Sequence, residues 1–130
     1  MNQRENIYRC NVCGNIVEMV HASKGQLVCC GQPMELLTEK TEDAGFEKHV
    51  PVVTEENSKA NIKVGSIPHP MEPEHYIEWI ELDVGDKIHR AFLKPGQAPE
   101  TKFCMPKSPG ARVREYCTVH GLWANNDLGK

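Results

Sequence analysis

Four cysteines near the start of the chain constrain its fold more than any other feature. Cys10 and Cys13 are separated by two residues, and Cys29 and Cys30 are adjacent. The surrounding segment, residues 7–37, is punctuated by turns and poor in large apolar residues, so it has too little hydrophobic core to fold alone. Four thiolates can close a tetrahedral metal site, which in small modules supplies folding free energy on the order of 10 kcal/mol. The pattern therefore predicts a small metal-stapled module.

The alternative use of these cysteines is in disulfides. Adjacent Cys29 and Cys30 cannot easily bond each other, and residues 1–9 are polar and charged, without the apolar segment of a signal peptide. We therefore expect a cytoplasmic chain with reduced thiols that serve as metal ligands. Zinc and iron both accept four thiolates, so a zinc staple and an iron centre remain open at this point.

The composition excludes several classes of function. The chain has 130 residues, of which 39% are hydrophobic and 25% are charged, as expected for one small globular domain with a short extra module. Its formal net charge of -3 gives no overall basic field for nucleic acid or acidic lipid. No apolar run approaches about 18 residues, the length of a membrane span. We expect neither nucleic acid nor a membrane as a partner.

Beyond residue 46 the apolar residues alternate with polar ones, as in β-strands that are half buried. Pro- and Gly-containing turns separate these runs, which is typical of a β-sandwich, and no segment shows the apolar stripe of a helix. The runs are centred on Ile62 and Val64, Ile77 to Leu82, Ile88 to Leu93, Phe103 and Met105, and Val113 to Tyr116. The sequence thus predicts an all-β fold with a metal-binding module in 1–37, an acidic linker in 38–46 and a sandwich in 47–130.

The predicted sandwich carries a second set of donors, with four imidazoles and one thiolate. They are His49, His69, His75, Cys117 and His120. His69 and His75 lie on a proline-constrained loop that can aim both rings at one point, and the Cys-x-x-His spacing converges its two side chains. His21 and His89 lie in no motif and are interpreted as ordinary surface or core residues.

Five such donors suit a first-row metal such as iron and leave a sixth octahedral position open for chemistry. A thiolate opposite that position would raise the reducing power of Fe(II). A cupredoxin site would need a methionine shortly after His120, and none follows. An oxygenase triad has two histidines and a carboxylate, and hydrolytic zinc usually keeps three ligands, so neither matches five donors.

Together these motifs resemble those of the desulfoferrodoxin family, the two-iron superoxide reductases, over nearly the whole chain. The matching segments are Cys10-x-x-Cys13, Cys29-Cys30-Gly31, Glu47 to Pro51, His69 to Met71, His75, and Arg114 to Trp123. The resemblance implies a desulforedoxin-like N-terminal domain with an Fe(Cys)4 centre, followed by an immunoglobulin-like β-sandwich with an Fe(His)4Cys centre. In that centre His49, His69, His75 and His120 would be equatorial and Cys117 axial.

The resemblance also implies the reaction, a one-electron reduction of superoxide to hydrogen peroxide, with rubredoxin or a similar protein as electron donor and a homodimer as the assembly. Two residues beside His49 then gain roles. Lys48 would place a positive charge near the open position, and Glu47 would reach the oxidised iron as a sixth ligand. A plain electron carrier and a zinc-stapled binding module remain as alternatives from other classes.

Two further residues carry expectations of their own. Glu115 should share one side of its strand with Cys117, either close to the metal site or in a surface salt bridge. Cys104 belongs to neither motif and is expected to be a buried apolar thiol.

Overall fold

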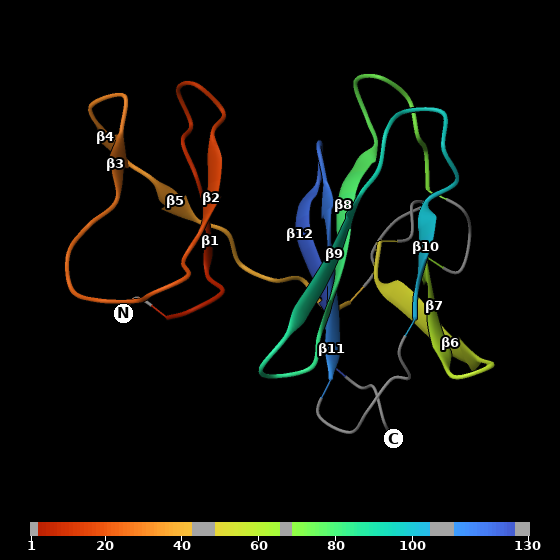
Figure 1. Cartoon of the computed structure of the whole chain (residues 1–130). Helices are drawn as coiled ribbons and strands as arrows, with labels where there is room; N and C mark the ends of the chain where they lie inside the picture. The colour runs from red at the N-terminus through yellow and green to blue at the C-terminus, as the bar shows by residue number, and fades with distance from the viewer. Residues whose placement is uncertain (1–2, 43–48, 66–68, 105–110, 127–130) are drawn as a thin grey trace. The chain divides into compact units, whose positions relative to one another are not determined.

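The computed structural model describes residues 3–42, 49–65, 69–104 and 111–126 of the chain. Within these ranges every regular element is a β-strand, which confirms the expected all-β class. The chain divides into two compact units, Met1–Thr38 and Glu39–Lys130 (Figure 1). A helical membrane span is absent from these described ranges.

The N-terminal unit consists of short strands. They are β1 (Ile7–Arg9), β2 (Ile16–Glu18), β3 (Val28–Cys29), β4 (Gln32–Pro33) and β5 (Glu35–Leu36). β1 is the middle strand of an antiparallel sheet between β2 and β5, and β3 and β4 form a separate hairpin. The buried apolar residues described in this unit are Ile7, Tyr8 and Cys10, whereas Val12, Val20 and Val28 are exposed. Its hydrophobic core is therefore small, as the sequence indicates.

The second unit consists of two sheets. Its strands are β6 (Pro51–Glu56), β7 (Lys59–Val64), β8 (Ile77–Asp83), β9 (Ile88–Phe92), β10 (Glu100–Phe103), β11 (Arg112–Cys117) and β12 (Gly121–Asn125). One sheet has the order β10-β7-β6 and the other the order β12-β11-β8-β9 (Figure 1). Every pairing within them is antiparallel.

The core of this unit lies between the two sheets, which makes it the sandwich that the sequence predicts. Its fully buried side chains are Ala60, Ile62, Val64, Ile77, Ile80, Leu82, Ala111, Val113 and Cys117. Alternation along the strands explains the set, because residues at every second position point to one face of a sheet. The end of β11 therefore brings the thiol of Cys117 into an apolar interior.

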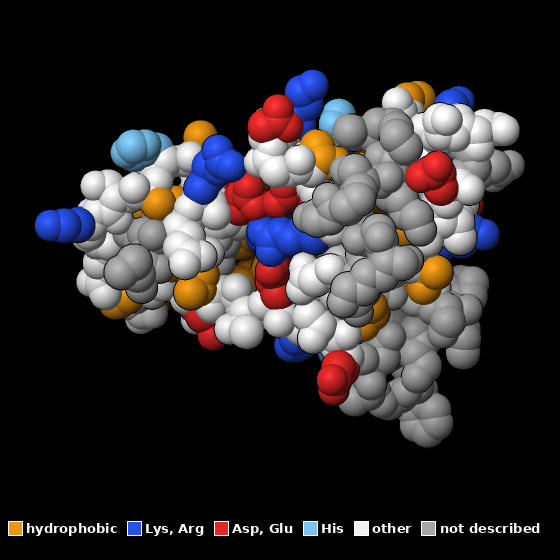
Figure 2. Space-filling model, turned by 90° about the horizontal axis from the view of Figure 1, so that it is seen from below, with side chains coloured by type: hydrophobic (Ala, Val, Ile, Leu, Met, Phe, Trp, Pro, Cys, Tyr) orange, Lys and Arg blue, Asp and Glu red, His pale blue; other side chains and the backbone are white. Residues whose placement is uncertain are grey.

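The other face of the four-stranded sheet carries buried charges. Arg114 and Glu81 lie opposite each other on β11 and β8 and are 2% and 0% exposed. An Arg114 nitrogen lies 3.0 Å from a Glu81 oxygen, and Arg90 lies at the same distance from that oxygen. Arg112 similarly contacts Asp83 at 3.1 Å. The buried Glu81 carboxylate is thus compensated by cations, as burial requires. Figure 2 shows that acidic and basic side chains also lie next to each other on the surface that it presents.

Two expectations about single residues are settled by burial. Glu115 lies opposite Ile80 and is 0% exposed, so it shares the interior side with Cys117 and cannot form a surface salt bridge. Cys104 is exposed, so the expectation of a buried thiol was wrong. Cys104 directly follows the last residue of β10, Phe103, where the strand pairing has ended and the chain leaves the sheet.

Candidate metal centres

The first donor group forms where β1 ends. A tight turn follows Arg9, in which the Gly14 amide donates to the Cys10 carbonyl at 2.9 Å. Gly14 has a φ of +85°, a conformation that favours glycine. This turn points the amides of Val12 and Cys13 at the Cys10 sulfur, each at 3.4 Å. The hydrogen bond from the Cys13 amide, which has the larger effect, and the one from the Val12 amide lower the pKa of Cys10 to about 6. The knuckle thus stabilises a thiolate.

The adjacent cysteines occupy the turn of the β3–β4 hairpin. Cys29 pairs with Gln32, so Cys30 and Gly31 form a two-residue turn, with φ of +53° and +73°. Both values are left-handed, as in the hairpin turns that match strand twist. This conformation is uncommon for a residue with a Cβ, and it lets two neighbouring sulfurs approach the knuckle from the same side.

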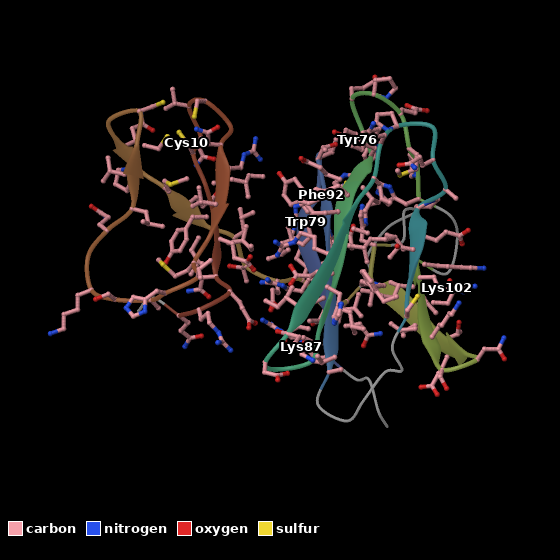
Figure 3. All side chains as sticks on the ribbon, in the orientation of Figure 1. Cys10, Tyr76, Trp79, Lys87, Phe92 and Lys102 are labelled. Carbon is pink, nitrogen blue, oxygen red and sulfur yellow. The ribbon has the colours of Figure 1, made fainter. Side chains whose placement is uncertain are left out.

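The four sulfurs have the spacing of a metal site. Cys13 and Cys29 sulfurs are 3.6 Å apart, those of Cys29 and Cys30 are 3.9 Å apart, and all four lie within 4.8 Å of one another. A tetrahedron with metal–sulfur bonds of about 2.3 Å has edges of roughly 3.8 Å. The thiols are all free, which agrees with the expectation of reduced cysteines. Figure 3 shows sulfur atoms gathered near Cys10.

Cys29 and Cys30 favour the protonated form without a cation. Hydrogen bonds to the sulfurs of Cys10 and Cys13, together with burial, raise the pKa of Cys29 to about 12. The Cys13 sulfur likewise raises the pKa of Cys30. A divalent cation at the centre of the group would reverse this preference, because it attracts all four thiolates.

The second donor group lies where several strands of the sandwich begin or end. His49 precedes β6, His75 precedes β8, Cys117 ends β11 and His120 lies in the turn before β12. With His69, their donor atoms all lie within 4.8 Å of one another, so the structure brings together all five predicted residues. Because these positions are far apart in sequence, only the folded sandwich creates the group. His49, His69 and Cys117 are buried, and the other two are partly exposed.

The four imidazoles form a closed ring. Neighbouring ring centroids are 4.6 Å apart for His49 and His69, 4.9 Å for His69 and His75, 5.0 Å for His75 and His120, and 4.8 Å for His120 and His49. The His49 Nε2 atom lies 2.9 Å from His69 Nε2 and 3.1 Å from His120 Nδ1. Adjacent ligands with bonds of about 2.1 Å to one octahedral ion would be roughly 3.0 Å apart. The imidazoles therefore fit one metal ion.

The thiolate completes this group from the interior of the sandwich. The Cys117 sulfur lies 3.5 Å from His69 Nε2 and 3.8 Å from His120 Nδ1. The His120 amide donates to this sulfur at 3.4 Å, which favours its ionised form. At the other end of the Cys117 turn, the Thr118 amide donates to the Tyr76 carbonyl at 3.0 Å and so ties the end of β11 to the start of β8. Figure 3 labels Tyr76 at that end of β8.

Neighbouring groups orient the individual rings. His69 Nδ1 lies 2.8 Å from the Pro70 carbonyl, so it carries the proton and leaves Nε2 as the donor to a metal. The segment before His75 is closed by reciprocal backbone bonds with Glu72, of 2.9 and 3.0 Å. Trp123 stacks on His49, with centroids 4.5 Å apart and planes 12° apart. The sequence pattern did not reveal this Trp123 contact, because it gives no sign of which aromatic residue lies against a ligand.

Four further residues from the sequence analysis lie outside the two donor groups or outside the described residues. His21 is exposed and His89 packs near Phe103, and neither belongs to a donor group among the described residues, as expected. Glu47 and Lys48 lie outside the described residues. Their predicted roles stay predictions.

The fold and the two donor groups define an all-β protein with two metal centres of different composition, one of four cysteines and one of four histidines and a cysteine. The family described as Desulfoferrodoxin matches residues 41–126, and the one described as Desulfoferrodoxin, N-terminal domain, matches residues 2–37. The chain belongs to the desulfoferrodoxin family. Its two donor groups are those of the two-iron members, which confirms the expected pair of iron centres.

Individual relatives support this assignment. A desulfoferrodoxin homolog of Archaeoglobus fulgidus is 54% identical over 123 residues, covering 95% of this chain and 98% of the relative. A superoxide reductase of Pyrococcus abyssi is 35% identical over 106 residues, covering 68% of this chain and 92% of the relative. The crystal structure of the superoxide reductase from Treponema pallidum superposes with a TM-score of 0.74 at 27% identity, covering 92% of this chain and 96% of that one.

Proposed function

We propose that the chain is a superoxide reductase, which combines superoxide with one electron and two protons to give hydrogen peroxide. The observation that carries the proposal is the closed ring of four imidazoles beside one buried thiolate. A ligand set with five donors leaves one octahedral position for a small substrate, whereas a purely structural zinc site is usually tetrahedral and closed. Relatives named superoxide reductase support the same reading.

In this proposal His49, His69, His75, His120 and Cys117 would hold the catalytic iron. The nitrogen distances of 2.9 and 3.1 Å suit neighbouring ligands of one ion. When bound, ferrous iron supplies the electron that superoxide accepts. The Cys117 thiolate favours the transfer because its negative charge stabilises the oxidised state of the centre, and the His120 amide holds that thiolate in place.

Lys48 and Glu47 complete the proposed site on the basis of the family resemblance. A lysine beside a ligand attracts an anionic substrate, and Glu47 would reach the iron after the product has left. Replacing Lys48 by isoleucine should slow the reaction with superoxide and weaken its dependence on ionic strength. An unchanged rate would refute the role of Lys48.

The four-cysteine centre is proposed to pass electrons to the catalytic centre from rubredoxin or a similar donor. Cys13 and Cys30 are exposed, whereas Cys10 is buried, so one side of this centre is accessible from solvent. We also propose a homodimer, because the small core of the N-terminal unit would gain from a partner surface. Sedimentation of the iron-loaded protein tests the dimer, and reduction of the four-cysteine centre by reduced rubredoxin tests the donor.

The proposed activity is tested with purified, iron-loaded protein and its His75→Ala variant. Wild type should contain about two irons per chain, show thiolate-to-iron absorption, and, once reduced, consume superoxide in pulse radiolysis. His75→Ala removes one donor, so it should lose the second centre while the four-cysteine absorption persists. Zinc in both sites of the protein as it is isolated from cells, or equal superoxide consumption by wild type and variant, would refute the proposal.

A further inference from the structure

Lys40 is attached to the strand that follows the second donor group. The Lys40 amide donates to the Leu122 carbonyl at 3.0 Å, and the Ala124 amide donates to the Lys40 carbonyl at 2.8 Å. These bonds place Lys40 beside Trp123 in a parallel bridge with β12. The carboxylate of the preceding residue, Glu39, contacts Arg112 at 2.6 Å and so holds the residue before Lys40 in place as well. The backbone of Lys40 is therefore held in position.

The side chain of Lys40 reaches the turn that carries His120. Its ammonium donates to the His120 carbonyl at 2.8 Å. Gly121 has a φ of +88°, and a Cβ built there would lie 4.0 Å from the same ammonium. The left-handed glycine lets the chain turn sharply after His120 and leaves room for the lysine. The ammonium thus restrains a peptide group of one proposed iron ligand.

The same ammonium contacts a second proposed ligand through Trp123. It lies 5.3 Å from the centroid of the indole ring, within the range of a cation–π interaction. Trp123 in turn stacks on His49 at 4.5 Å. One cation therefore acts on two of the four imidazoles, His120 through its carbonyl and His49 through the indole.

Lys40 forms no salt bridge with an acidic residue in the described part of the chain. The carboxylate of the neighbouring Glu39 is bound to Arg112 instead. A positive charge close to a metal centre favours the state with the lower net charge, which for iron is the reduced one. Groups behind the ligands also orient them and commonly affect metal retention.

We propose that Lys40 is a positioning residue of the four-histidine centre, which holds His120 and the Trp123–His49 stack in place and raises the reduction potential of the bound metal. This inference rests on the proposed iron ligands. Lys40 is not proposed to contact the substrate.

The test compares iron-loaded wild type with Lys40→Met, Lys40→Arg and Lys87→Met. Methionine keeps the length of the side chain but removes the charge and the donor, whereas arginine keeps both. Lys87 is an exposed lysine in the turn between β8 and β9, at the end of the sandwich away from Tyr76 (Figure 3). Two quantities are measured, the reduction potential of the four-histidine centre and the rate at which a chelator removes its metal.

Lys40→Met should have a lower reduction potential than wild type and should lose metal several-fold faster. Lys40→Arg and Lys87→Met should match wild type in both. Equal potentials in Lys40→Met, Lys87→Met and wild type would overturn the inference. So would a lower potential in Lys40→Met that arginine does not restore, because the effect would then not depend on the charge.

If Lys40→Met does not retain iron, Lys40→Gln provides a second uncharged variant for the same comparison of potentials. A different result would refute the proposed function: wild type itself would hold no iron at the four histidines, or it would not consume superoxide. Normal superoxide consumption by wild type, with unchanged potentials in both uncharged variants, would refute the role of Lys40 alone.

Discussion

Among the single residues, Cys10 differs from the other thiols of its group because its sulfur accepts two backbone hydrogen bonds. Its ordinary pKa of 9.0 is lowered to about 6 by the folded knuckle. A lowered pKa stabilises the folded form fully above pH 9.0, and this contribution is lost as the pH falls through about 6. Cys10 is therefore the thiolate that prepares the site for a cation near neutral pH.

This difference predicts the pH dependence of metal uptake. Cobalt binding to the four-cysteine site of the full chain should weaken as the pH falls towards 6. Cys10→Ser should shift the uptake curve to higher pH than Cys30→Ser, because the pKa values of Cys29 and Cys30 are raised and these thiols must then lose their protons unaided. Absorption of cobalt–thiolate bonds measures uptake at each pH. Equal shifts in the two variants would contradict the role assigned to Cys10.

The sequence predicted the metal-donor side chains well, but it did not predict which residues contact them. Residue type and spacing pointed to all nine cysteine and histidine donors, because few side chains bind metals and each was placed by a recognisable motif. The contacts of Lys40 with Trp123 could not be predicted, because the two residues are far apart in sequence and no motif links them. The burial of Glu115 likewise depends on its pairing with β8, and the exposure of Cys104 depends on where β10 ends.

Among the elements, β8 and β11 have residues buried on both of their faces. Ile80 and Leu82 face the core, whereas Glu81 faces Arg114 on the other side. Alternation in the sequence predicted that these segments are strands, but a charged residue at an alternate position would ordinarily indicate solvent. Cross-strand pairing of opposite charges explains how both faces can be buried.

Loss of one partner from this pair should destabilise the sandwich. Arg114→Met leaves the buried Glu81 carboxylate with Arg90 alone and should lower the free energy of unfolding by roughly 3 kcal/mol. Lys63→Met removes an exposed pair with Glu100 and should cost about 1 kcal/mol or less. Both tryptophans lie in this unit, so their fluorescence during denaturant unfolding reports on the sandwich. Equal losses in the two variants would argue against a stabilising buried pair.

The positions of the short strands in the N-terminal unit could not be predicted from the sequence. Strands of two or three residues contain no measurable alternation, and their positions follow from the turns around the cysteines. The domain bounds inferred from the sequence, with a linker in 38–46, stay a prediction. Residues at the start of that segment pair with β12, as the bonds of Lys40 show.

In the whole molecule, the two donor groups lie in two compact units, and we propose that they have separate tasks. The donors of the first centre all lie within Met1–Thr38 and those of the second within Glu39–Lys130. Since the two donor groups share no residue, each centre can be removed while the other is kept.

This separation predicts the behaviour of Cys13→Ser. The variant should lose the absorption of the four-cysteine centre but keep the second iron. After chemical reduction, it should still consume superoxide in a single turnover at a rate close to that of wild type, because the proposed chemistry takes place at the four-histidine centre. Loss of that turnover with the second iron still bound would contradict the division of tasks.

We propose that the ring of four imidazoles and the Cys117 thiolate hold an iron that reduces superoxide. The most direct test is the yield of hydrogen peroxide when the reduced protein meets a known amount of superoxide in pulse radiolysis. We expect one peroxide per superoxide, with one electron lost from the catalytic iron and no release of dioxygen. A yield of half a peroxide together with dioxygen, as in dismutation, would contradict the proposal.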